Sequence, residues 1–324
     1  MRKTLHYIGL PLLALLLGAT PACKKKDSGK IDPKIGLAMA DFQNLWNRTA
    51  SLYMQDTAAQ RNQPYALSYS NSAEDQLERI ARMAGDLECK AVILQNRDLT
   101  AEQVNEALID RGIPVILLQN RLDVAYRFFI TGDDEGAGRT AGEFLCERLA
   151  AMESPHKRVL VIDVKDSPRS VTRTDACVAA LRTAGFEDIV RAEATAYIQD
   201  AGKEAVNTAL ADPNSFMIKA VYAPDDALAA GVFERITEGT QTSNIEAIAG
   251  CGGLKVFLEQ IIANETGIAL GTAYYPAEMS LQCFGAAREL IVEGMEPLQK
   301  DVLVETGLID AANAGEFLDS EVSF

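Results

Sequence analysis

The sequence is poor in histidine, and this excludes several kinds of active site. Only His6 and His156 occur in 324 residues, and His6 lies in an apolar N-terminal leader that processing would remove. A zinc site with two histidines is then impossible, and a Ser-His-Asp or Cys-His arrangement would depend on His156 alone, in the polar stretch "MESPHKR". The phosphate-loop and dinucleotide-binding glycine patterns are also absent. We therefore expect no catalytic residues, no metal and no cofactor; an enzyme built on carboxylates alone is the alternative.

Basic residues are scarce as well. The chain has 31 Lys and Arg against 46 Asp and Glu, which gives a net charge of −15. Without Arg2 and Lys3 of the leader, 29 basic residues remain against 46 acidic ones, and the net charge becomes −17. Such an acidic surface repels phosphate backbones, so we expect no nucleic-acid partner.

Long hydrophobic runs occur only at the N-terminus. "MRKTLHYIGLPLLALLLGATPA" has basic residues at its start and an apolar run too short to span a bilayer permanently, so we predict a signal peptide over residues 1–22. Cys23 follows directly and resembles a bacterial lipoprotein cleavage site. We expect lipid on Cys23, membrane attachment through it, and a polar tether over residues 23–34. Ordinary cleavage that leaves a soluble protein is the alternative.

No CxxC pair occurs, which disfavours a redox or structural zinc motif. Cys89, Cys146, Cys177, Cys251 and Cys283 follow the leader, and the sequence alone does not pair them. We expect Cys146 and Cys177, which lie in apolar helical patterns, to be packed small hydrophobes.

Short β-branched runs alternate along the chain with longer helical patterns. Ser72 and Gly85 bound one predicted helix, and Thr100 and Gly112 bound another. Apolar strands separated by amphipathic helices predict parallel sheets covered on both faces. Ten such strands are too many for one open sheet, so we predict two doubly wound α/β domains divided near "AMESPHKR". The strands are expected at residues 35–40, 65–70, 91–96, 114–119, 127–132, 158–163, 188–194, 220–225, 246–252 and 267–275.

One predicted helix, in "DSPRSVTRTDACVAALRTAGF" (166–186), carries two arginines in an unfavourable place. Ser167 is a good N-cap, and Arg169 and Arg173 fall in the first turns, off the apolar face. A cation there typically costs about 0.3–1 kcal/mol against the helix dipole. One explanation for Arg173 is that Asp163, Asp166 or Asp175 neutralises it at the surface.

The order of these segments resembles the periplasmic sugar-binding proteins of the ribose and galactose type, relatives of the lactose-repressor ligand core. The resemblance covers residues 33 to 320 and rests on five stretches: "IGLAMADFQNLWNRT", "GIPVILLQNR", "ITGDDEGAGRTAGEFL", "AVYAPDDALAAG" and "VLVETGLIDAANAGEF". It implies a type I periplasmic binding protein with a three-stranded hinge near residues 132, 274 and 303. The lobes would be residues 35–132 plus 275–303, and 133–274 plus 304–324. No helix-turn-helix precedes the core, which favours a binding protein over a repressor.

The resemblance also implies a ligand site in the cleft between the lobes. Arg173 would donate to ligand oxygens, whereas Arg169 would make no contact. Trp46 and Tyr197 would stack on a sugar ring, with core packing as the alternative for each. Asp226 would be the N-cap of the helix that follows. The remaining polar candidates, several of them departures from the family pattern, are Gln43, Asn44, Gln95, Gln119, Asp225 and Tyr274.

These expectations define a function. We expect a monomeric, periplasmic or cell-surface lipoprotein that delivers a sugar or sugar-like polar molecule to the permease of an ABC importer. The exchanged polar positions indicate a ligand other than plain ribose, glucose or galactose. A sensor subunit that presents a ligand to a chemoreceptor or histidine kinase is the alternative, and an enzyme on the same fold is a third.

Overall fold

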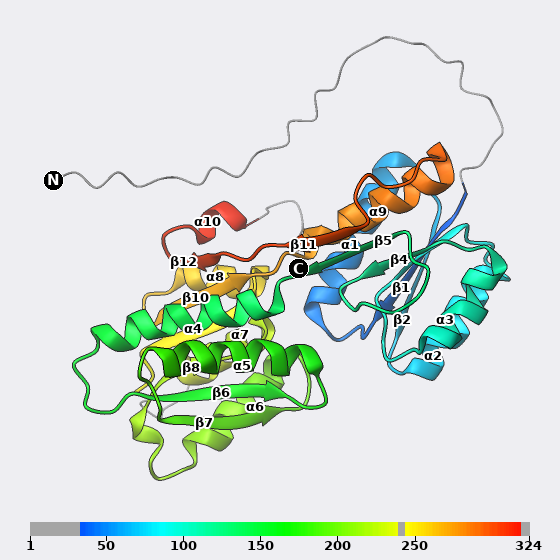
Figure 1. The fold of residues 1–324 in the computed structure, drawn as a ribbon. Coiled ribbons are helices and arrows are strands. Elements are labelled where there is room, and N and C mark those ends of the chain that lie inside the picture. The colour runs from blue at the N-terminus through cyan, green and yellow to red at the C-terminus, as the bar shows by residue number, and fades with distance from the viewer. Residues whose placement is uncertain (1–32, 239–243, 319–324) are drawn as a thin grey trace. The chain divides into compact units, whose positions relative to one another are not determined.

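The structure is a computed structural model, and it describes residues 33–238 and 244–318. It has two six-stranded sheets with helices on both faces of each (Figure 1). The predicted signal peptide, Cys23 and almost all of the tether lie outside the described residues.

The first sheet has the strand order β11-β5-β4-β3-β1-β2, and every pairing in it is parallel. Its strands are β1 (Ile35–Ala40), β2 (Tyr65–Ser70), β3 (Ala91–Leu94), β4 (Val115–Leu118), β5 (Phe128–Gly132) and β11 (Asp301–Val304). Its helices are α1 (Leu45–Arg61), α2 (Ala73–Ala84), α3 (Ala101–Ala107), α9 (Ser280–Arg288) and the short turns η1 (Ile109–Arg111), η3 (Ala277–Met279) and η4 (Glu289–Glu293).

The second sheet has the order β12-β10-β9-β8-β6-β7, and only β12 is antiparallel to its neighbour. Its strands are β6 (Arg158–Val164), β7 (Ile189–Ala194), β8 (Ile218–Tyr222), β9 (Ala247–Gly252), β10 (Ala269–Tyr274) and β12 (Leu308–Asp310). Its helices are α4 (Asp134–Ala151), α5 (Pro168–Thr183), α6 (Gln199–Leu210), α7 (Asp226–Glu238), α8 (Lys255–Ala263), α10 (Ala314–Phe317) and η2 (Ser215–Met217). We call each sheet with its helices the first lobe and the second lobe.

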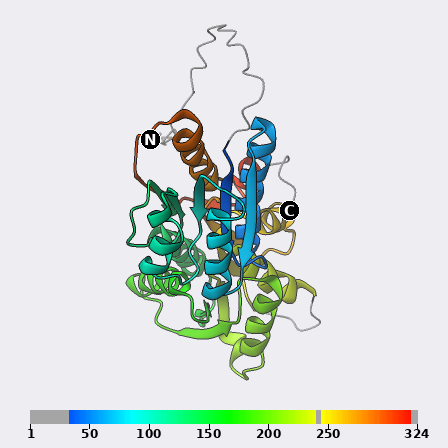
Figure 2. The same ribbon diagram turned by 90° about the vertical axis from the view of Figure 1, so that its right-hand side faces the viewer.

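The chain passes between the two lobes three times. It leaves the first sheet after β5, returns after β10, and crosses again between β11 and β12. Segments far apart in the sequence therefore share a lobe: α9 packs beside α1, as the orange and blue helices in Figures 1 and 2 show. This confirms the predicted α/β fold with two parallel-sheet domains and a three-stranded hinge. The residue limits predicted for the lobes stay a prediction.

Both faces of each sheet are buried, as a doubly wound sheet requires. In β1, the adjacent residues Leu37 and Ala38 join different core clusters, the first with α1 and α9 and the second with α2 and α3. In β6, likewise, Leu160 packs in the core cluster with α6, α7 and α8, and Val161 packs in the cluster with α4 and α5. Successive side chains of a strand point to opposite faces, so such a strand must be apolar throughout rather than alternating.

The predicted helix starts are confirmed by their capping hydrogen bonds. The side chains of Ser72, Thr100 and Ser167 accept the backbone N–H groups of Asp75, Gln103 and Ser170. Two strands were not predicted, β11 and β12, of four and three residues. Both lie at the edges of their sheets, and in β11 the burial alternates instead of being continuous, so neither carries the apolar run that marks the central strands.

Cys89, Cys146, Cys177, Cys251 and Cys283 are all free thiols, and Cys146 is the only one of these five that is not fully buried. The expectation that Cys177 is a packed hydrophobe is confirmed, since it lies in the core between α4, α5 and the second sheet. No helix within residues 33–238 and 244–318 is long and apolar enough to cross a membrane.

Candidate functional site

A polar cavity of about 600 Å³ lies between the two lobes. Its walls are the segments that follow six parallel strands: β1, β3, β4 and β5 of the first sheet, and β6 and β7 of the second. Ligands of open parallel sheets bind at the carboxyl ends of the strands, and this volume is within the usual range for small-molecule sites. The lining residues include Asn44, Asn47, Gln95, Asn96, Arg97, Gln119, Asn120, Arg121, Asp134, Lys165, Ser167, Arg169, Thr172 and Tyr197.

A row of amide side chains forms the wall on the first lobe. Gln95 Nε2 donates to Asn47 Oδ1 at 2.7 Å and to Gln119 Oε1 at 2.6 Å. The backbone N–H of Ala40 donates to Gln95 Oε1 at 3.0 Å. The row thus joins the ends of β1, β3 and β4, and the predicted residues Gln95 and Gln119 lie side by side in it. Asn44 also lines the cavity, and its side chain caps α1 by accepting the N–H of Asn47.

Arg169 and Arg173 are placed differently from what was expected. Arg169, which was expected to stay outside the cleft, lines the cavity. Its Nη1 donates to Gln119 Oε1 at 3.1 Å and its Nη2 to Asn120 Oδ1 at 2.8 Å, across the space between the lobes. Arg173 is not among the residues that line the cavity, and contact between a ligand and Arg173 stays a prediction.

Arg173 lies deeper, with only 4% of its side chain exposed. Its Nε donates to Asp134 Oδ1 at 2.8 Å and its Nη1 to the carbonyl of Pro224 at 2.7 Å, while the guanidinium stacks 4.3 Å from the ring centre of Tyr275. Burial is the largest single effect and opposes the charge, but the negative charge of Asp134, together with smaller effects of Cys251, Tyr275 and Tyr197, outweighs it, so the pKa of Arg173 lies well above its ordinary value. The side chain therefore stays a cation, held by groups of its own lobe and by the second crossing of the hinge.

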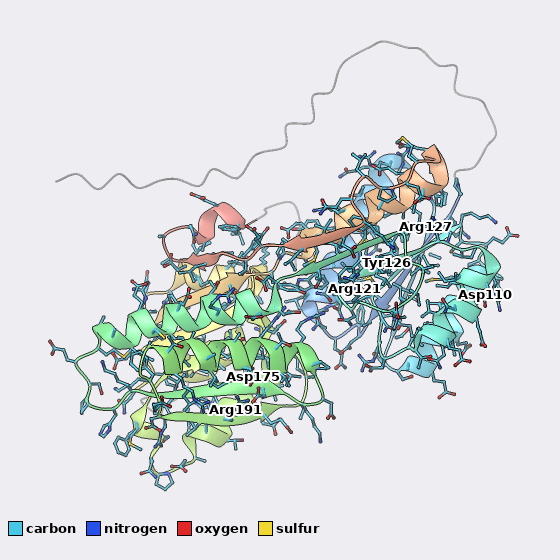
Figure 3. The ribbon with its side chains drawn as sticks, viewed as in Figure 1. Asp110, Arg121, Tyr126, Arg127, Asp175 and Arg191 are labelled. Atoms are coloured by element: carbon cyan, nitrogen blue, oxygen red, sulfur yellow. The ribbon has the colours of Figure 1, made fainter. Side chains whose placement is uncertain are left out.

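The alternative that surface aspartates neutralise Arg173 is wrong for two of the three candidates. Asp163 and Asp175 bind Arg191 instead, at 2.8 Å and 3.1 Å, and Figure 3 shows Asp175 beside Arg191. The acidic partner is Asp134, the first residue of α4.

The two predicted aromatic residues lie in different environments. Tyr197 lines the cavity, and its hydroxyl lies 2.5 Å from the Ser167 hydroxyl. Trp46 is 4% exposed and belongs to the core of the first lobe, where its indole N–H donates to the carbonyl of Tyr275 at 2.9 Å. The core-packing alternative thus describes Trp46, which ties α1 to the hinge.

Asp225 and Tyr274 also lie away from the cavity wall. Asp225 accepts the N–H of Ala227 at 2.8 Å, so the carboxylate expected to bind ligand caps α7. Burial raises the pKa of Asp225 to about 6. Tyr274 packs against Phe317 with ring centres 5.1 Å apart, and burial raises the pKa of its phenol. Gln43 is exposed in the β1–α1 loop and does not line the cavity either.

Asp226, expected to cap α7, instead holds a turn of the second lobe. Its Oδ2 accepts the N–H groups of Gly253 and Leu254 at 2.6 and 2.8 Å, and its Oδ1 accepts the hydroxyl of Thr272 at 2.5 Å. Gly253 adopts φ +84°, and a side chain at Gly250 would collide with the carboxylate. Burial raises the pKa of Asp226 to about 7, and the neighbouring carboxylate of Asp225 adds to the shift.

Several cavity residues were missed by the sequence reasoning. Asn96, Arg97, Asn120, Arg121 and Lys165 all lie within three residues of a strand end. That position, together with the predicted parallel sheets, was a usable signal, because all parallel strands of a sheet end at the same edge. Arg121, labelled in Figure 3, also donates to the Tyr126 hydroxyl at 2.7 Å.

The cavity offers many groups that can bind a small polar molecule. It presents amide donors and acceptors, hydroxyls, and charged groups of both signs, which suit a small polar molecule with several hydroxyl groups. Within residues 33–238 and 244–318, no three His, Cys, Asp or Glu side chains are grouped so that they could hold a metal ion.

Comparison with known proteins gives the same architecture. The family described as the periplasmic binding protein domain matches residues 35–293. No curated protein sequence matches the chain. Similar solved structures include a galactofuranose-binding protein, with a TM-score of 0.74 and 19% identity over 88% of this chain and 97% of that one. A Caulobacter myo-inositol-binding protein bound to myo-inositol has a TM-score of 0.75 and 18% identity over 91% and 97%.

A third similar structure is an ABC transporter periplasmic solute-binding protein from Actinobacillus succinogenes with bound D-allose. Its TM-score is 0.72, with 16% identity over 88% of this chain and 99% of that one. At these identities the likeness establishes the fold.

Proposed function

Since the chain belongs to the periplasmic binding protein domain family, whose members are non-enzymatic solute binders, we propose that it is the extracytoplasmic solute receptor of an ABC importer. Its ligand would be a sugar or sugar-like polyol, held in the cavity between the lobes. The observation that carries the proposal is the cavity itself: about 600 Å³, polar, and lined from both lobes at the carboxyl ends of their strands.

A two-lobed site of this kind couples binding to motion. A ligand that contacts both lobes stabilises the state in which the lobes are closed around it, because only that state makes both sets of contacts. The permease of an importer would recognise this state, so ligand binding and partner recognition would be linked. The relatives in complex with myo-inositol and D-allose support a polyhydroxylated ligand for this chain.

The amide row supports the same ligand class. The amide oxygens of Asn47 and Gln95 each accept one hydrogen bond within the wall and can accept a second one from a ligand hydroxyl, and Gln119 adds an amide nitrogen that can donate. Tyr197 adds the one aromatic ring among the residues that line the cavity, and such a ring can cover the C–H face of a sugar. The predicted ligand contacts of Arg173, Asp225 and Tyr274 stay predictions, since none of the three lines this cavity.

The test starts with the solute that the protein carries. We expect mass spectrometry of the protein purified from its native host to find a bound polyol or sugar, and calorimetry with that solute, myo-inositol or D-allose to give saturable binding. Gln95→Leu should weaken binding about tenfold or more, because it removes hydrogen bonds to the ligand and to the wall. Gln60→Leu, the same change at an exposed position of α1, is the control. Unchanged affinity in a folded Gln95→Leu protein would contradict the assigned site.

We further propose that Cys23 carries lipid and anchors the protein to a membrane, as the preceding "ATPA" suggests. Cys23→Ala should leave the chain unprocessed or release it from membranes. Fractionation followed by immunoblotting measures this directly. An unchanged membrane-bound fraction of mature length would contradict lipidation at Cys23.

A further inference from the structure

One side chain of the second lobe reaches across the cavity to the first. The two terminal nitrogens of Arg169 donate to Gln119 Oε1 at 3.1 Å and to Asn120 Oδ1 at 2.8 Å. Gln119 and Asn120 directly follow β4 of the first sheet, whereas Arg169 lies in the first turn of α5 of the second lobe. These hydrogen bonds therefore link the lobes directly, apart from the three crossings of the hinge.

The guanidinium of Arg169 is oriented by contacts with its own lobe and with the hinge. Its Nε lies 3.6 Å from Asp134 Oδ2, and its central carbon lies 5.8 Å from the ring centre of Tyr275. Asp134 is itself fixed by the shorter ion pair with Arg173. With 22% of its side chain exposed, Arg169 presents its two terminal nitrogens toward the first lobe.

Donors from both lobes converge on a single oxygen. Gln119 Oε1 accepts Gln95 Nε2 at 2.6 Å from the first lobe and Arg169 Nη1 from the second. A guanidinium edge matches two neighbouring oxygen atoms, and it binds most strongly when these belong to one planar or vicinal group. In this structure the two oxygens are Gln119 Oε1 and Asn120 Oδ1, which belong to separate neutral amides, and a small ligand can replace them as acceptors.

We propose that Arg169 is the residue that determines specificity in the cleft, a proposal that rests on the proposed function. In this structure it joins the lobes through Gln119 and Asn120. A ligand binds by offering two adjacent acceptor oxygens, either a vicinal hydroxyl pair or a carboxylate, in place of those amides. Molecules without such a pair leave the cation without acceptors and are rejected, because an unpaired polar group in a closed site is unfavourable.

The first test needs no ligand. Small-angle X-ray scattering of the ligand-free full chain should give a larger radius of gyration for Arg169→Ala than for the wild type, because the direct link between the lobes is lost. Arg182→Ala removes an exposed arginine from the same helix and should leave the radius unchanged. Equal radii for the wild type and Arg169→Ala would overturn the proposed link.

The second test uses defined probes: myo-inositol, D-galactose, D-galacturonate and a deoxy analogue of each neutral probe that lacks one hydroxyl of a vicinal pair. For every probe that binds the wild type, Arg169→Ala should lose at least about tenfold in affinity, and Arg169→Lys should restore only part because an ammonium lacks the two-nitrogen edge. Equal affinity of Arg169→Ala and Arg182→Ala would overturn the specificity role. Failure of all probes with the wild type would contradict the proposed function, and scattering would still decide whether Arg169 joins the lobes.

Discussion

Replacement of Asp226 by asparagine should change how the stability of this protein depends on pH. The carboxyl group is fully buried and accepts hydrogen bonds from Gly253, Leu254 and Thr272. Burial raises its pKa to about 7, against about 3.9 in an unfolded chain. The folded protein thus binds this proton more tightly than the unfolded chain does. Binding of this proton therefore stabilises the folded protein fully below about pH 4. This stabilisation decreases as the pH rises toward 7 and is absent above it.

The size of the effect follows from these two pKa values. A difference of one pKa unit corresponds to about 1.4 kcal/mol, so the free energy of unfolding should fall by roughly 3 kcal/mol between pH 5 and pH 8 through this group. The amide introduced by Asp226→Asn has nearly the same volume as the carboxyl group. Its oxygen can accept both backbone N–H groups, and its nitrogen can donate to the hydroxyl of Thr272. We therefore expect Asp226→Asn to lack this fall and to gain most over the wild type at pH 8.

Urea unfolding at pH 5, 6, 7 and 8, followed by circular dichroism, measures the difference. Asp225, whose raised pKa acts in the same direction, is present in both proteins, so the difference between the two curves reports Asp226 together with its interaction with Asp225. Asp123→Asn, at an exposed position, is the matched control and should parallel the wild type. If the curves of Asp226→Asn and the wild type were parallel over this range, the assignment of a buried, proton-binding carboxyl would be refuted.

Two further substitutions test the core and the hinge. Trp46→Phe removes the hydrogen bond to the carbonyl of Tyr275, so the free energy of unfolding, measured by circular dichroism, should fall by about 1–3 kcal/mol. Solute affinity should stay within about twofold, and a large loss of affinity with normal stability would show that Trp46 binds the ligand. Gly138→Ala would place a methyl carbon 1.9 Å from the carbonyl oxygen of Arg173 and should destabilise the protein by about 1–3 kcal/mol or more. Gly285→Ala, with open space around it, is the control and should be neutral or stabilising. Equal melting temperatures of the two variants would contradict the close packing of α4 on α5.

Ligand contact by the predicted site residues stays a prediction, but the structure shows which of them line the cavity. Gln95, Gln119 and Asn44 follow strands whose apolar runs were visible, and all three line the cavity. Other residues named from the same resemblance do not line the cavity. Trp46 lies in the core because its partners, such as Tyr275, are distant in the sequence, whereas Asp225 caps α7 through a local bond to Ala227.

The sequence by itself determined the elements and the architecture. Continuous apolar runs can be buried only in sheets covered on both faces, and the caps at Ser72, Thr100 and Ser167 act within a single turn, so both signals are local. The edge strands β11 and β12 carry no such signal, since their place depends on partners that the chain meets after a crossing between lobes.

Only the tertiary structure decided which arginine faces the cavity. Arg169 and Arg173 are four residues apart on the same side of α5, so helical periodicity does not distinguish them. The difference comes from α4, where Gly138 lets the backbone of Arg173 approach closely and Asp134 binds its guanidinium. Arg169, one turn nearer the helix start, extends past this contact to the amides of the first lobe. The partners of both arginines are distant in the sequence, and only folding brings them to α5.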